Sequence, residues 1–216
     1  ISGNVNQILT ENAASILIDD GTWIGSLDYI EATKGYWLRL DGEGITEYAI
    51  STYQTSSQQI FSLHAGWNLI SYIGQDNIAL DEALPDDIEM LFTDIMSENI
   101  VAMRNEDGQW IGSLADIGWQ HLKGYWVYVI EPVDFMFNLT DNLPKFVNNQ
   151  MPDYNIYNYP FMLRYKQSQK QSFYYFRDVT IDDENITEDD WIIAYNNDSI
   201  VGARKWSGPY TDVPVM

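Results

Sequence analysis

The sequence predicts a mainly β protein made of small antiparallel sheet, sandwich or barrel modules with short helical inserts, in tandem. Aromatic residues are frequent, with 15 Tyr, 8 Trp and 8 Phe in 216 residues, and such side chains pack well on pleated sheets. Several short runs alternate apolar and polar side chains between Gly and Asn turns. Almost the same heptapeptide occurs twice, as GTWIGSL from Gly21 and GQWIGSL from Gly108.

The heptapeptide belongs to a longer internal repeat. Residues 8–21 align without a gap on residues 95–108, which gives a period of 87 residues. Downstream, KGYWLRL from Lys34 aligns on KGYWVYV from Lys123 at a period of 89, after a two-residue insertion near Trp119. A shared pattern of this length predicts an internal duplication.

Each repeated motif predicts a local structure. The WIGSL segments alternate like strands, and Gly25 marks a bulge or a close approach of another chain segment. The GYW segments are apolar on both faces, which favours strands covered on two sides. GWNLISYIG (66–74) and NIVAMRN (99–105) are further strands, and the three-four spacing of apolar residues over 88–95 predicts a helix.

The first copy is incomplete at its start. The ungapped alignment places the counterpart of Trp67 before Ile1, so the opening strand of this copy is missing from the chain. We expect an open sheet edge, with the strand supplied from upstream in a longer protein or by a neighbouring chain. A ragged half-module is the alternative, and the absence of an initial Met fits a piece of a longer protein.

The chain divides into four expected segments. Residues 1–50 form the incomplete first module, 61–135 the second module, 136–160 a linker and 161–216 a C-terminal β module. In the last module we expect strands at 161–165, 172–181, 190–196 and 199–206. The turn Asn196–Asp198 joins the last two as a hairpin.

These motifs together resemble a known group of modules. GWNLISY, WIGSL, GYW and the final DWIIAYNNDSIVGARKW are similar to repeats in large secreted or cell-surface proteins of marine and anaerobic bacteria. The resemblance implies an exported, modular, mostly β protein, and it implies no catalytic residues. The missing GWN strand of the first copy departs from this pattern.

Composition excludes several classes of function. The formal net charge is −21, with 32 acidic against 11 basic residues, so the basic footprint of a nucleic-acid-binding protein is missing. No apolar run is long enough to predict insertion into a membrane. The absence of cysteine excludes disulfides and thiolate metal sites.

One acidic segment is a candidate calcium site. Asp182, Asp183, Glu184, Asp189 and Asp190 lie close together in the sequence, and calcium prefers hard oxygen ligands on loops. An ordinary Asp-rich turn is the alternative interpretation. Residues 41–43 form a second candidate loop of the same kind.

Aromatic residues are candidates for a carbohydrate platform. Trp119 and His121 lie in the insertion that the first copy lacks, so an exposed indole there is predicted to stack on a sugar. The alternative is that Trp119 covers the end of its own module. Trp206 and Tyr210 are a second pair, either core residues or a second surface patch. The repeated tryptophans are expected to be interior: Trp23, Trp37, Trp110 and Trp126.

No arrangement of residues points to catalysis, so the sequence predicts a protein that is not an enzyme. We expect a secreted or cell-surface segment that makes structural or adhesive contacts with other proteins or with copies of itself, through sheet edges and module ends. A carbohydrate-binding module of an exported enzyme is the alternative. A glycosidase with paired carboxylates is a third possibility that acid counts alone do not exclude.

Overall fold

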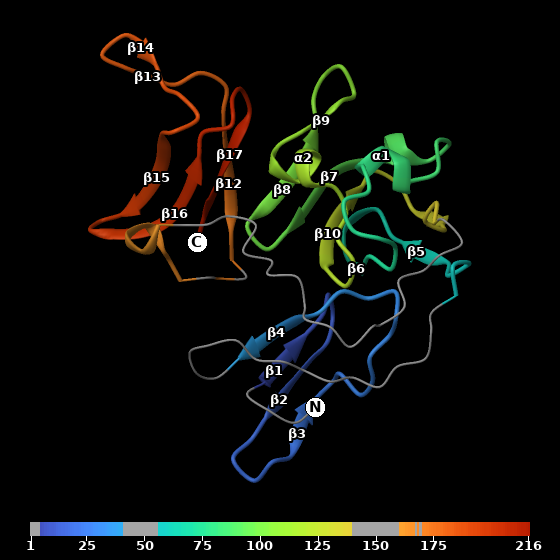
Figure 1. Ribbon diagram of the computed structural model, residues 1–216. Helices are drawn as coiled ribbons and strands as arrows, with labels where there is room; N and C mark the ends of the chain where they lie inside the picture. Colours follow the sequence, from blue (N-terminus) through green and yellow to red (C-terminus); the bar gives the residue numbers. More distant parts are fainter. Residues whose placement is uncertain (1–4, 41–55, 140–159, 167, 169) are drawn as a thin grey trace. The chain divides into compact units, whose positions relative to one another are not determined.

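The computed structural model describes residues 5–40, 56–139, 160–166, 168 and 170–216 (Figure 1). Strands make up 44% and helices 8% of the described residues, which confirms the predicted mainly β class. None of the described sheets closes on itself. No helix in the described ranges is long and apolar enough to cross a membrane. Contacts divide the chain into two compact units, Ile1–Ser97 with Ile117–Lys145 and Glu98–Asp116 with Phe146–Met216.

The first unit opens with a four-stranded antiparallel sheet, drawn in blue in Figure 1. Its strand order is β3-β2-β1-β4, with bounds β1 Val5–Leu9, β2 Ala14–Leu17, β3 Trp23–Gly25 and β4 Trp37–Leu40. The predicted close approach at Gly25 is present, because a Cβ there would lie 2.1 Å from the Ala14 carbonyl oxygen. Gly25 also has φ +148°, a conformation that side chains rarely allow.

A second group of strands completes the first unit. Strand β10 pairs antiparallel with β6 on one edge and with β7 on the other, and β5 pairs with β11. The bounds are β5 Phe61–Leu63, β6 Gly66–Ser71, α1 Leu80–Ala83, the 3₁₀ helix η1 Glu89–Leu91, β7 Phe92–Ser97, β10 Gly124–Val129 and β11 Val133–Phe135.

The prediction of a helix over residues 88–95 is wrong. Only the short η1 forms, and β7 follows it directly. The cause is a β-bulge, since Phe92 pairs with Val129 but Asp94 already pairs with the adjacent Tyr128. The extra residue places Phe92 and Ile95, three positions apart, on the same buried face of a strand. The bulged strand therefore has buried residues three positions apart, which is the spacing that predicted a helix.

Aromatic rings fill the core of the first unit. Neighbouring centroids lie 4.7–5.4 Å apart, mostly edge to face, which is the favoured geometry for ring pairs. The rings belong to Phe61, Tyr72, Phe92, Trp119, Tyr125, Phe135 and Phe137. Phe137 falls in the segment expected as a linker, so the packed part of this module extends beyond residue 135.

The second unit consists of short antiparallel pairs. Strand β8 pairs with β9, β12 with β17, β13 with β14 and β15 with β16. The bounds are β8 Ile100–Arg104, β9 Trp110–Ile111, α2 Ser113–Ile117 (which ends in the first unit), the 3₁₀ helix η2 Phe161–Leu163, β12 Ser172–Phe176, β13 Thr180–Ile181, β14 Glu184–Asn185, β15 Trp191–Asn196, β16 Ser199–Lys205 and β17 Thr211–Val215.

Two expectations for this unit have opposite outcomes. The β15–β16 hairpin is confirmed, since Asn196 pairs with Ser199 and Asn197 has φ +52°, as a tight turn requires. The strand expected at 161–165 is wrong, because the segment forms η2 after Pro160, whose ring presets a helical φ angle.

Candidate functional site

Trp119 is not an exposed platform. Its side chain has 0% exposure, its ring stacks on Tyr72 at 5.2 Å, and its indole N–H donates to the Leu80 carbonyl at 3.3 Å. The polar atom of the indole is therefore satisfied inside the module. Trp119 closes the core, which is the alternative interpretation of the insertion, and it is unavailable to a sugar.

His121, two residues after the buried Trp119, is half-buried and forms hydrogen bonds within its own module. Its backbone N–H donates to Asp76 Oδ1 at 2.7 Å, and its Nδ1 lies 2.8 Å from the Gly74 carbonyl oxygen. In the second unit, Trp206 and Tyr210 are also half-buried. The Trp206 backbone N–H donates to the Asp190 carbonyl at 2.9 Å, and Tyr210 has φ +68°.

The candidate calcium ligands do not converge. Asp182 and Asp183 are the two turn residues of the β13–β14 hairpin, with φ +52° and +66°. Such a turn favours Asp, Asn and Gly, which explains the acidic run without an ion. In the described ranges, no group of three or more His, Asp or Glu side chains is arranged to hold a metal.

The remaining acidic side chains of this segment have other roles. Glu184 begins β14 and is exposed. Asp190 Oδ2 accepts the Thr187 N–H at 2.7 Å, while Asp189 lies 3.9 Å from the Lys205 ammonium. The second candidate loop, 41–43, lies outside the described residues.

The repeated tryptophans are half-buried, not interior as expected. In β10 the buried side chains alternate as Tyr125, Val127 and Val129, so Trp126 lies on the opposite face. The four residues concerned are Trp23, Trp37, Trp110 and Trp126.

The second unit contains a buried ion pair. Arg204 Nη2 lies 2.9 Å from Asp212 Oδ2, with both side chains almost fully buried. Ser113 donates its N–H and its hydroxyl to the same carboxylate at 2.6 and 3.0 Å. Burial raises the pKa of Asp212, while Arg204 and Ser113 oppose this effect. The cluster is enclosed within the second unit, so removing one member of the pair would leave the other charge buried.

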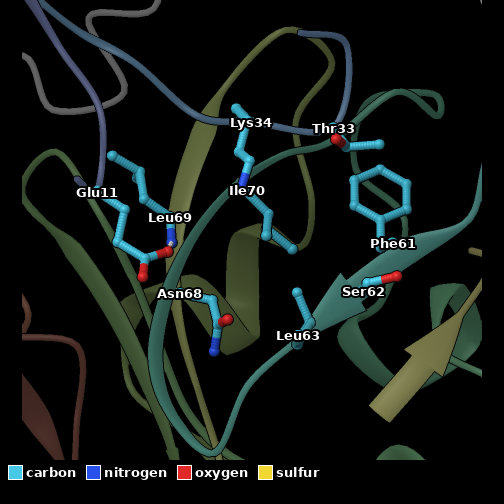
Figure 2. Close-up of a pocket in the computed structure, with 9 residues that line it drawn as sticks. All are labelled: Glu11, Thr33, Lys34, Phe61, Ser62, Leu63, Asn68, Leu69 and Ile70. Atoms are coloured by element: carbon cyan, nitrogen blue, oxygen red, sulfur yellow. Dashed lines mark hydrogen bonds between the residues drawn. The ribbon is translucent and has the colours of Figure 1, made fainter. Parts of the chain in front are cut away.

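The first unit has a small pocket where β6 meets the end of the first sheet (Figure 2). Glu11, from the turn after β1, accepts the Leu69 N–H at 3.3 Å and contacts His64 Nε2 at 2.6 Å. On the same edge of β6, the Gly35 N–H donates to the Leu69 carbonyl at 3.0 Å. The Glu11 side chain and the Gly35 main chain thus join the first sheet to β6.

The pocket offers little room for a ligand. Its volume is about 20 Å³, which is space for roughly one water molecule. The pKa of His64 is raised, first by the hydrogen bond to the Ala65 carbonyl and then by Glu11. Glu11 and His64 are 53 positions apart, and no motif in the sequence indicated that they would meet.

Strand β4 is the second candidate site. Among the described residues it is the outermost strand of its sheet. Its pairing with β1 has the same register and the same bulge position as the pairing of β10 with β7. The matching pairs are Val5↔Leu40 with Phe92↔Val129, Gln7↔Arg39 with Asp94↔Tyr128, Ile8↔Leu38 with Ile95↔Val127, and Leu9↔Trp37 with Met96↔Trp126.

Side-chain hydrogen bonds around β4 and β10 also correspond. The Tyr36 hydroxyl accepts the Glu31 N–H at 2.8 Å, and the Tyr125 hydroxyl accepts the Gln120 N–H at 2.8 Å. Thr10 and Ser97 donate their hydroxyls to the carbonyls of Gly35 and Gly124 at 2.7 and 2.8 Å, respectively. The two strands thus begin from equivalent local structures.

Burial separates the two strands. Leu38 and Leu40 of β4 are 48% and 43% exposed, whereas Val127 and Val129 at the matching positions of β10 are 0% exposed. By register, Leu38 lies on the same sheet face as its partner Ile8, which is buried. β4 therefore carries an apolar strip that continues a buried face up to the sheet edge.

No family model matches the chain, and no curated protein or solved structure matches it at a significant level. The function is therefore inferred from the geometry of the chain itself.

Proposed function

We propose that this chain is a non-catalytic segment of an exported, modular surface protein, acting in structural or adhesive contacts between proteins through sheet edges and module ends. The exposed apolar strip of β4, Leu38 and Leu40, is the observation that carries the proposal. An outermost strand offers backbone hydrogen bonds, and apolar side chains beside it add buried area on binding.

The proposal includes a duplicated module. The common registers of β4 and β10, together with the paired tyrosine hydrogen bonds, support it. The glycines that follow the two Trp-Ile dipeptides also support the duplication. Gly25 and Gly112 both have positive φ and approach the carbonyls of Ala14 and Val101, which are aligned in the repeat.

The charge supports a protein partner. A net charge of −21 keeps a segment with an exposed apolar strip soluble, and it disfavours nucleic acids and anionic membrane surfaces. The alternative of a carbohydrate-binding module is weakened, because Trp119, its main candidate residue, is buried.

Sedimentation velocity and titration with extended peptides test the proposal. We expect the chain to associate with itself or with strand-forming peptides, and we expect the double substitution Leu38→Lys, Leu40→Lys to weaken this association. Ile181→Lys is the matched control, since it removes an exposed apolar side chain of the β13–β14 hairpin. The proposal would be contradicted if the chain is monomeric, does not bind the peptides and binds sugars on a glycan array.

A further inference from the structure

We infer that the edge of β4 that no described strand occupies accepts an antiparallel strand with the chemistry of β6, a Gly-Trp-Asn-Leu type segment of another polypeptide. This inference rests on the proposed function and names the class of partner. It places the incoming backbone beside Trp37–Leu40, next to the exposed side chains of Leu38 and Leu40.

The second group of strands provides the template. One edge of β10 pairs with β7 and the other with β6, from Gly124↔Ser71 to Val129↔Gly66. Strand β4 repeats the β10 register on the first of these edges. Because N–H and C=O groups alternate along a strand, an equal register on one edge gives equal spacing on the other. The edge of β4 therefore matches the one that β6 occupies on β10.

The length of the site is limited by contacts already made. Residues just before β4 meet the outer edge of β6, through the bridge Lys34↔Ile70 and the bond from the Gly35 N–H to Leu69. The segment left for a partner is Trp37–Leu40. In the register of β10, it pairs with four residues that correspond to Gly66–Leu69.

Side chains give the site a preference. Trp67 of β6 lies opposite Tyr128 and packs edge to face on it at 5.4 Å. Arg39 occupies the corresponding position of β4, and its side chain is exposed. An incoming tryptophan would lie beside the Arg39 guanidinium, where a cation–π contact is favourable. The site therefore prefers a strand with an aromatic residue opposite Arg39.

A fusion tests the inference within one molecule. A copy of residues 60–87 is placed directly before Ile1, which continues the 87-residue period because Ile88 aligns with Ile1. We expect the amides of Trp37–Leu40 that face the incoming strand to exchange with solvent at least about tenfold more slowly, as pairing requires. The control fusion carries the same segment with the copied Gly66–Ser71 in scrambled order, and it should give no protection.

A labelled peptide of residues 60–87 tests the same site between molecules. We expect it to bind the unmodified chain, to bind Arg39→Glu several-fold more weakly, and to be excluded by the fusion. Equal exchange in the two fusions, with no difference between Arg39→Glu and the unmodified chain, would overturn the inference. In that case the proposed function would still hold if self-association, or binding of other peptides, is weakened by substituting Leu38 and Leu40.

The opposite result is also informative. If the fusion protects the β4 amides but the unmodified chain neither self-associates nor binds peptides, the proposed function alone is refuted.

Discussion

Strands β4 and β10 begin from the same local pattern and end in different surroundings. Both contain the tryptophan of a Lys-Gly-Tyr-Trp sequence, and they pair with β1 and β7, respectively, in the same register around one bulge. Yet Val127 is fully buried, while Leu38 at the matching position is 48% exposed. The difference shows that local sequence determines the strand and its register, whereas neighbouring elements determine whether its apolar face becomes core.

The largest expected difference in unfolding free energy is between aspartate substitutions at matching positions of β10 and β4. Val127→Asp places a carboxylate in a closed core and should cost about 4 kcal/mol or more of unfolding free energy. Leu38→Asp should cost at most about 1 kcal/mol, because solvent reaches the new carboxylate. Urea denaturation followed by tryptophan fluorescence measures both. Equal costs would show that β4 is covered in solution.

Alanine at the two matched glycines should reveal a shared constraint. A Cβ on Gly25 or Gly112 would lie 2.1 or 2.6 Å from a carbonyl oxygen, and both residues have positive φ. We expect each Gly→Ala change to cost about 2 kcal/mol or more in urea denaturation. Gly21→Ala is the control, since Gly21 has positive φ but no atom within 4 Å of the added Cβ. A Gly25→Ala cost no larger than that of Gly21→Ala would argue against the close approach.

Removing the matched tyrosine hydroxyls should have unequal effects. Tyr125→Phe leaves the buried Gln120 N–H without its acceptor and should cost about 1–3 kcal/mol. Tyr36→Phe breaks the same bond in a half-exposed setting, where water replaces the hydroxyl, so about 0.5 kcal/mol is expected. Thermal melts of both variants test this order, and the reverse order would contradict the burial contrast.

The smallest expected effect concerns His64. Its pKa is raised in the folded chain, so its contribution to stability is complete below the ordinary histidine pKa of about 6.5. The contribution is lost as the pH rises through the raised value. An NMR titration of the imidazole should give a lower pKa in Glu11→Gln than in the unmodified chain. An unchanged pKa would show that Glu11 does not contact His64 in solution.

Local patterns in the sequence predicted the strands better than the burial. Apolar runs and turn residues correctly indicated β6, β10 and the β15–β16 hairpin. The segment 88–95 misled because a bulge spaces its buried residues like those of a helix. Trp119 could not be assigned from its position in an insertion, since its burial depends on Tyr72 and Phe137, which are distant in the chain.

The candidate site was only partly predictable. The repeat pattern predicted an open edge on the first sheet, and β4 is outermost among the described strands. The contact between Glu11 and His64 was not foreseen, because the two residues come together only when the chain folds. The acidic run at Asp182 had a simpler cause in the chemistry of its turn.

The Glu11 carboxylate has a consequence for how copies of such a module would add to one another. It takes the Leu69 N–H and so occupies the outer edge of β6 together with the backbone of Lys34 and Gly35. No described strand occupies the outer edge of β4. If copies add by strand pairing, growth would proceed from β4 and not from β6, and so in a single direction.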